Sequence, residues 1–213
     1  MLARISSRLR QSQDEIDASP LQQFGQVKVG DIKYKDVNED GVINENDYVA
    51  MDYGNAFPAL NYGLSFGLEF KGVGINATFQ GASHQIKNLM YIDGVWGALS
   101  NNRNLSREYL DNCFDIAGAD ALYPRLSTTN VANNAQSSTI WFRDVNWFKL
   151  RDCEVYYKLP ASFLRQIKVS DAKLFVQGQN LLSFGNIPAM DAENLSTGYP
   201  VMKAVTMGLS VVF

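Results

Sequence analysis

The sequence contains few of the residues that catalytic and metal sites commonly use. Among 213 residues there are one histidine, His84, and two cysteines, Cys113 and Cys153. The cysteines lie far apart with no C-x-x-C pair, so neither a zinc site nor a disulfide framework is predicted. His84 has no nucleophile elbow around it and is expected in a loop. Asp191 and Glu193 have the chemistry of glycosidase carboxylates, but nothing in the sequence sets their spacing, and we expect no enzyme.

The sequence also lacks an excess of positive charge and any long apolar run. A formal net charge of −3 gives no electrostatic reason to expect nucleic acid as a partner. No run approaches 18 consecutive apolar residues, so no transmembrane helix is predicted. The first 20 residues carry arginines but no apolar h-region, so they are not a secretory signal. A frayed helix or surface loop is expected there.

What the sequence does contain is a strongly alternating stretch from Asn61 to Gln80. Apolar residues alternate with small or polar ones along two arms, and Lys71-Gly72 stands between the arms as a two-residue turn. The apolar set is Tyr62, Leu64, Phe66, Leu68, Phe70, Val73, Ile75, Ala77 and Phe79. The pattern predicts an antiparallel β-hairpin with one apolar and one polar face.

Two environments suit this hairpin. Ten residues per arm, tilted about 45°, span roughly 23 Å, close to the apolar band of roughly 25 Å in an outer-membrane barrel. A soluble antiparallel sheet with one wet face shows the same alternation. A barrel protein must be exported, so the missing signal predicts that the chain is a piece of something longer, or else that it is not a barrel.

A second pattern, from Asp36 to Asp47, has the spacing of a calcium loop. Oxygen-bearing residues stand at positions one, three, five and twelve, and Gly41 stands at position six. The predicted ligands are the side chains of Asp36, Asn38, Asp40 and Asp47 and the carbonyl of Val42. Ile43 is expected to anchor the loop inward. The alternative is an acidic turn without metal.

The remainder of the chain predicts shorter elements separated by loops. Ser106 to Phe114 is expected as a short helix, and 160–168 as one or two helical turns. Strands are expected at 147–157, with a bulge near Arg151-Asp152, and at 172–182 and 201–213. Aromatic residues of the long loop either stack on a sugar or pack, and packing is favoured. These residues are Trp96, Tyr123 and Trp141.

With these motifs in view, the chain resembles the C-terminal part of SusC/RagA-type TonB-linked outer-membrane proteins. The likeness covers about Ser12 to Phe213 and rests on motifs in a fixed order. They are Gly30 to Asn38 with Asp40-Gly41, Tyr62-Gly63-Leu64, Phe79-Gln80-Gly81, Tyr123 to Leu126, Trp141 to Asp144, Tyr157 to Pro160, and Gln179-Asn180-Leu181. Thr206, Gly208, Val211 and Phe213 fit the family's barrel-assembly signal.

The resemblance implies an all-β fold, the C-terminal portion of a transmembrane antiparallel barrel of about 22 strands with long extracellular loops. One partial barrel domain, 1–213, is expected. It would comprise an extracellular loop at 1–60 with the calcium-like turn, the hairpin at 61–80, a long extracellular loop at 81–140, and the last three strands at 146–213. Counting back from a periplasmic C-terminus places Lys71-Gly72 and 160–168 in the periplasm.

The implied function is TonB-dependent uptake of glycans or peptides across the Gram-negative outer membrane. The implied partners are outer-membrane lipid, a SusD-like lipoprotein, and the missing N-terminal barrel and plug, through which alone TonB would act. The fragment is expected to be inactive by itself, and its substrate-binding residues are unknown. The alternative is a calcium-binding interaction module, because Asp36 to Ile43 also resembles a dockerin loop. That fold needs a second copy, which the sequence does not contain.

Overall fold

The computed structural model describes residues 2–50, 57–91, 104–166, 168–187, 191–194 and 201–213. Its contacts divide the chain into two compact units. Unit 1 comprises Met1–Ala56 and Ile86–Asp144, and unit 2 comprises Phe57–Gln85 and Val145–Phe213. None of the helices in the described residues is long and apolar enough to cross a membrane.

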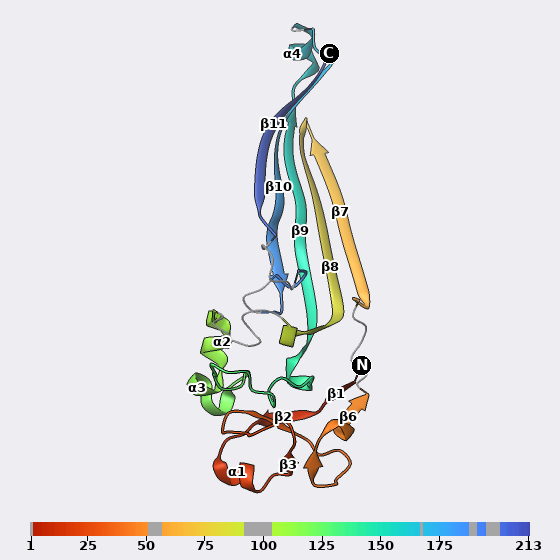
Figure 1. Cartoon of the computed structure of the whole chain (residues 1–213). Helices are drawn as coiled ribbons and strands as arrows, with labels where there is room; N and C mark the ends of the chain where they lie inside the picture. The colour runs from red at the N-terminus through yellow and green to blue at the C-terminus, as the bar shows by residue number, and fades with distance from the viewer. Residues whose placement is uncertain (1, 51–56, 92–103, 167, 188–190, 195–200) are drawn as a thin grey trace. The chain divides into compact units, whose positions relative to one another are not determined.

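Unit 2 is built on one antiparallel sheet of five strands, in the order β11-β10-β9-β8-β7 (Figure 1). The strands are β7 (Leu60–Phe70), β8 (Val73–Asn88), β9 (Phe142–Lys158), β10 (Asp171–Gly185) and β11 (Ala204–Val212). Each strand pairs with its neighbour in sequence, so the sheet is a meander. Within the described part of the chain the sheet is open, because β7 and β11 each pair on one side only.

The predicted hairpin is confirmed as β7 and β8. The pairing runs without a break from Leu60 opposite Ser83 to Phe70 opposite Val73. Lys71 and Gly72 both have positive φ, 51° and 83°, as a type I′ turn requires.

Strand β8 continues to Asn88, beyond the predicted end at Gln80. The prediction of a loop histidine is therefore wrong. His84 lies within β8 with a positive φ of 57°, and its amide donates to Oδ1 of Asn146 at 3.1 Å.

The predicted irregularity between the next strands is present. The pairing of β9 with β10 shifts between Leu150 opposite Leu182 and Asp152 opposite Gln179. Two residues of β10, Asn180 and Leu181, therefore stand against Arg151 alone. Asn180 has a φ of 52°, so the left-handed residue of this bulge is on β10. Helix α4 (Ala161–Gln166) forms the predicted helical turns before β10.

Unit 1 consists of short strand pairs and helical turns. Its strands are β1 (Leu2–Arg4), β2 (Ser6–Leu9), β3 (Leu21–Gln22), β4 (Ile32–Tyr34), β5 (Val42–Ile43) and β6 (Tyr48–Ala50). Its helices are α1 (Gln13–Asp17), α2 (Arg107–Asn112), α3 (Phe114–Ala117) and the 3₁₀ turns η1 (Glu45–Asp47), η2 (Leu89–Tyr91), η4 (Gly118–Asp120) and η5 (Thr139–Trp141). The expected frayed helix or loop at the N-terminus is wrong for β1 and β2, which pair with β6 and β4.

Buried aromatic residues pack inside unit 1. Tyr109 and Tyr123 are stacked with ring centroids 4.9 Å apart, and Trp141 is fully buried, so packing is confirmed for these residues. Trp96 lies outside the described residues. Ser106 caps α2, accepting a hydrogen bond from the Tyr109 amide at 3.1 Å, as the sequence predicts.

Candidate functional site: a two-faced sheet

One face of the five-stranded sheet is apolar and exposed. On β7 the residues Phe66 and Leu68 are 43% and 68% exposed. Phe79 of β8 stacks on Phe66 and on Phe148 of β9, with centroids 6.2 and 5.4 Å apart. We call this the apolar face, and it also holds Tyr62, Leu64, Phe70, Val73, Ile75, Val155, Tyr157, Leu174, Val176, Val205, Met207 and Leu209. An exposed apolar surface that extends over all five strands is typical of a site that contacts a membrane or another protein.

The opposite face is polar, as the hairpin pattern predicts. Ser65 and Thr78 face each other across the hairpin with hydroxyl oxygens 3.0 Å apart. We call this the polar face, and its members include Gly63, Gly67, Glu69, Gly74, Asn76, Gln80, Glu154, Tyr156, Lys158, Lys173, Phe175, Gln177, Thr206, Gly208 and Ser210. The two faces are separate sets, because opposite residues of antiparallel strands point to the same side.

Ion pairs cross the polar face near the Lys71-Gly72 turn. Glu69 accepts from the Tyr156 hydroxyl at 2.8 Å and from the Lys158 ammonium at 2.7 Å. Lys173 donates to Glu154 at 2.5 Å. The Lys158 and Glu69 side chains are 45% and 39% exposed, so this pair adds little free energy of folding. Its main effect is to set the charge pattern of the polar face.

A tighter charged cluster joins β9 to the segment after β10. The Lys149 ammonium lies 2.6 Å and 2.7 Å from the two carboxylate oxygens of Asp191 and 2.8 Å from Glu193. Arg151 also pairs with Glu193 and donates to Gln80 at 2.9 Å. Lys149 is 1% exposed, and these two carboxylates supply the ion pairs that a buried ammonium needs.

Both carboxylates of the charged cluster are ionised at neutral pH. Burial alone would raise the pKa of Asp191 and of Glu193. Hydrogen bonds and charge from Lys149, and from Arg151 at Glu193, outweigh burial and hold each pKa below its ordinary value. A glycosidase acid needs a raised pKa to keep its proton. The pair therefore serves as an ionic anchor and does not suit acid–base catalysis.

Apolar contacts fix the same segment on the sheet. Ile187 and Ala192 are buried in a cluster with Ala82, Val145 and Trp147. Lys149 and its role were not predicted from the sequence. The available signal was a lysine between Phe148 and Leu150, at a polar-face position of a strand, together with two acidic residues in a later loop. Nothing in the sequence specifies that these charges meet.

The calcium-like loop is held by turn hydrogen bonds. The carboxylates of Asp36 and Asp40 each accept a backbone N–H at 2.8 Å, from Gly41 and Val42. Asn38 accepts the Asp40 amide at 3.2 Å. Gly41 has a φ of 80°, which explains glycine there.

Further contacts close the loop at its second half. Asp47 is fully buried, and its two oxygens accept the amides of Val37 and Asn44 at 2.8 Å each. Ile43 is fully buried, which confirms that it anchors the loop inward. Oδ1 of Asp36 is covered and has no hydrogen-bond partner within the described residues. Across those residues, no three His, Cys, Asp or Glu side chains group as a metal site, so calcium stays a prediction.

The residues of the proposed barrel-assembly signal lie along β11 and directly after it. Thr206 and Gly208 are on the polar face, opposite Gln177 and Phe175, and Val211 is on the apolar face. Phe213 follows the strand and is 91% exposed. Its role in assembly stays a prediction.

The chain is similar to part of known TonB-dependent receptors. No protein-family model matches the chain. TonB-dependent receptor P26 of Formosa agariphila is 26% identical over 224 aligned residues, covering 95% of this chain and 21% of that protein. TonB-dependent receptor P3 of the same organism is 24% identical over 201 residues, covering 84% of this chain and 19% of that protein. The chain thus spans about a fifth of the length of these curated relatives.

Solved structures share the fold. The RagAB peptide importer in the open-open state matches 100% of this chain and 22% of its own, with a TM-score of 0.68 and 18% identity. The RagAB peptide transporter matches 99% and 22%, with a TM-score of 0.69 and 17% identity. These comparisons confirm the resemblance to SusC/RagA-type receptors and the antiparallel barrel-wall fold. Such receptors are outer-membrane proteins and not enzymes, which agrees with the expected localisation and class.

Proposed function

We propose that this chain is a wall segment, with its outer loops, of a TonB-dependent transporter in the Gram-negative outer membrane. The two-faced sheet is the observation that carries the proposal. The eleven residues of β7, at about 3.3 Å each and tilted about 45°, give a height of about 26 Å, which matches an apolar barrel band of about 25 Å. The apolar face would meet lipid, and the polar face would line the lumen.

The open sheet supports a role as part of a larger wall. Two strand edges without partners are costly in lipid, where no water satisfies their backbone groups. We propose that the remaining barrel strands and a plug domain complete the transporter, and that TonB acts only through the plug. On this proposal the chain alone transports nothing.

The proposed cargo is a glycan or a peptide, captured with a SusD-like lipoprotein. Support for this comes from the family resemblance and from the name of the structural relative, a peptide importer. The ligand surface would be shared with other strands and with the lipoprotein, so no substrate residues are assigned to this chain.

The solution behaviour of the purified chain tests the proposal. We expect the chain to need detergent or lipid, and to aggregate when detergent is removed, because its apolar face and strand edges are then exposed to water. Sedimentation in detergent-free buffer measures this. A soluble monomer with one cooperative thermal transition would contradict the incomplete barrel.

A calcium ion in the Asp36 to Asp47 loop is a second proposal. It is favoured by one observation, the covered Oδ1 of Asp36 that has no partner in the described residues. A cation held with Asn38, Asp40, the Val42 carbonyl and Asp47 would satisfy that oxygen. The ion would then rigidify an outer loop of the transporter. The comparisons give no support to the alternative of a dockerin-like module without a transport role.

A further inference from the structure

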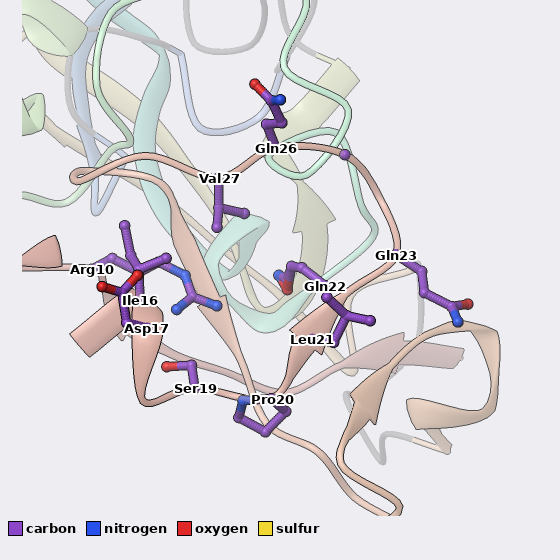
Figure 2. A pocket seen from close by; sticks show the side chains of 11 residues that line it. Arg10, Ile16, Asp17, Ser19, Pro20, Leu21, Gln22, Gln23, Gln26 and Val27 are labelled. Atoms are coloured by element: carbon purple, nitrogen blue, oxygen red, sulfur yellow. The ribbon is translucent and has the colours of Figure 1, made fainter. Parts of the chain in front are cut away.

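Unit 1 contains a pocket formed by the chain segment from Arg10 to Val27 (Figure 2). Its volume is about 590 Å³, within the usual range for sites that hold small ligands. Besides Arg10, its polar lining includes Ser19, Gln22, Gln23 and Gln26. The pocket lies outside the transport wall proposed above, and the inference drawn from it does not depend on that proposal.

Arg10 is a buried cation with two unsatisfied donor atoms. It follows β2 directly, is 1% exposed, and extends into the pocket in Figure 2. Its Nε and Nη1 are covered and have no acceptor within the described residues. Burial lowers the pKa of Arg10, and the nearby Glu15 and Asp31 oppose that shift. Because a guanidinium stays charged in proteins, its unsatisfied donors cost free energy of folding.

The neighbouring carboxylates already have cations of their own. Glu15 accepts from the Lys33 ammonium at 2.7 Å. Asp31, fully buried, lies 2.8 Å from the Nε of Arg125. Both carboxylates lie close enough to act on the charge of Arg10, yet neither makes a hydrogen bond with its covered Nε or Nη1. At Nε and Nη1, Arg10 therefore has no carboxylate as a hydrogen-bond partner within the described residues.

Gln22 presents the complementary group, an acceptor without a donor. Asn133 donates from Nδ2 to the carbonyl of Ile32 at 2.9 Å, so its Oδ1 is free to accept. This Oδ1 accepts a hydrogen bond from Nε2 of Gln22 at 2.5 Å. The amide of Gln22 is thereby oriented, and its Oε1 is left covered with no donor among the described residues. The pocket lining thus includes a cation and an acceptor, each with covered atoms that make no hydrogen bond within the described residues.

We propose that this pocket binds a small carboxylate with an N–H or O–H donor on the adjacent carbon. The carboxylate would pair with the fork of Arg10, which suits that shape, and the donor would bond Oε1 of Gln22. Asp17, whose carboxylate accepts from Gln13 at 2.8 Å, also lines the pocket and disfavours a second negative charge. Since these atoms of Arg10 and Gln22 are covered, binding includes a side-chain shift at the pocket, which is common when ligands bind.

The ligand itself is tested with three probes against the full chain in detergent. N-acetylglycine has the N–H donor, as a peptide C-terminus does, and glycolate has the O–H donor, as a sugar acid does. N-acetylglycinamide is the neutral control. Calorimetry or NMR titration should show saturable binding of at least one carboxylate and none of the amide. The acid that binds with the higher affinity shows whether the ligand is a peptide C-terminus or a sugar acid. Equal binding of the amide, or no binding of either acid at millimolar concentration, overturns the proposal.

Three arginine variants separate binding from folding. Arg10→Met should weaken carboxylate binding by about tenfold or more, and Arg10→Lys should weaken it less. Arg8→Met is the matched control, because Arg8 lies two residues earlier in β2, pairs with Glu15 and does not line the pocket. Without ligand, Arg10→Met should melt no lower than the wild type, since an unpaired buried charge is removed. Unchanged affinity, or loss of folding in Arg10→Met, contradicts the proposal.

Discussion

The ring of Tyr156 lies against the backbone of Gly74, where a β-carbon would come within 2.1 Å of the ring. Tyr156 belongs to β9 and Gly74 to β8. The missing side chain lets the phenol cross β8, so that its hydroxyl reaches Glu69 on β7 at 2.8 Å. A hydrogen bond between strands that are not neighbours therefore depends on a glycine between them.

Gly74→Ala should destabilise the sheet by about 1–3 kcal/mol, because the Tyr156 ring and the backbone of its strand must move to make room for the added methyl group. Gly63→Ala is the control on the same face, where the nearest atom to an added β-carbon is a backbone oxygen at 3.5 Å. Denaturant unfolding of the chain refolded in detergent measures both. If the two alanines cost the same, the ring does not occupy this position.

The charged cluster should make the stability of unit 2 depend on pH. The pKa values of Asp191 and Glu193 lie below their ordinary values in the folded state. Their contribution is therefore present above the unfolded-state pKa of about 4 and is lost as pH falls through the lower folded-state values. The midpoint temperature of thermal unfolding should therefore fall when the pH is lowered below about 4.5. The double variant Asp191→Asn/Glu193→Gln should have a lower midpoint at pH 7 and a flatter profile, and an unchanged profile would count against the anchor.

Calcium should stabilise unit 1 if the loop from Asp36 to Asp47 binds it. Asp36→Asn should weaken the affinity by about tenfold, since it removes one charged ligand. Glu39→Gln is the matched control, because it removes one charge from the same loop without changing a predicted ligand. Calorimetry and thermal melts with Ca²⁺ measure both. The absence of heat and of a melting shift in the wild type would show that the loop is an acidic turn.

Local pattern was enough to predict the parts of the fold that repeat. The hairpin, its turn at Lys71-Gly72 and its two faces followed from alternation, since a period of two fixes which side chains share a face. The cap at Ser106 followed from the residue type. Elements of two to four residues, such as β1 and β3, were missed because they are too short to show a period, and distant pairing forms them.

Relationships between distant residues were outside the reach of sequence reasoning. Lys149 meets Asp191, and Gln22 meets Asn133, only after the chain has folded, and their spacing in sequence carries no signal. Phe175 breaks the alternation of its strand, and the reason is its partner: its ring covers Gly208, where an added β-carbon would meet it at 2.5 Å. The order of family motifs predicted the resemblance, and no physical pattern in this chain specified its cargo.

Arginine at two adjacent positions of β7 tests the central claim, that the apolar face meets lipid and the polar face lines a lumen. Phe66 and Ser65 are neighbours in one strand and point to opposite faces. We expect Phe66→Arg to cost about 2–4 kcal/mol of folding free energy in lipid bilayers near the midplane, and Ser65→Arg to cost much less. The measurement is unfolding of each variant in vesicles. Equal costs, or a larger cost for Ser65→Arg, would contradict the proposed orientation of the wall.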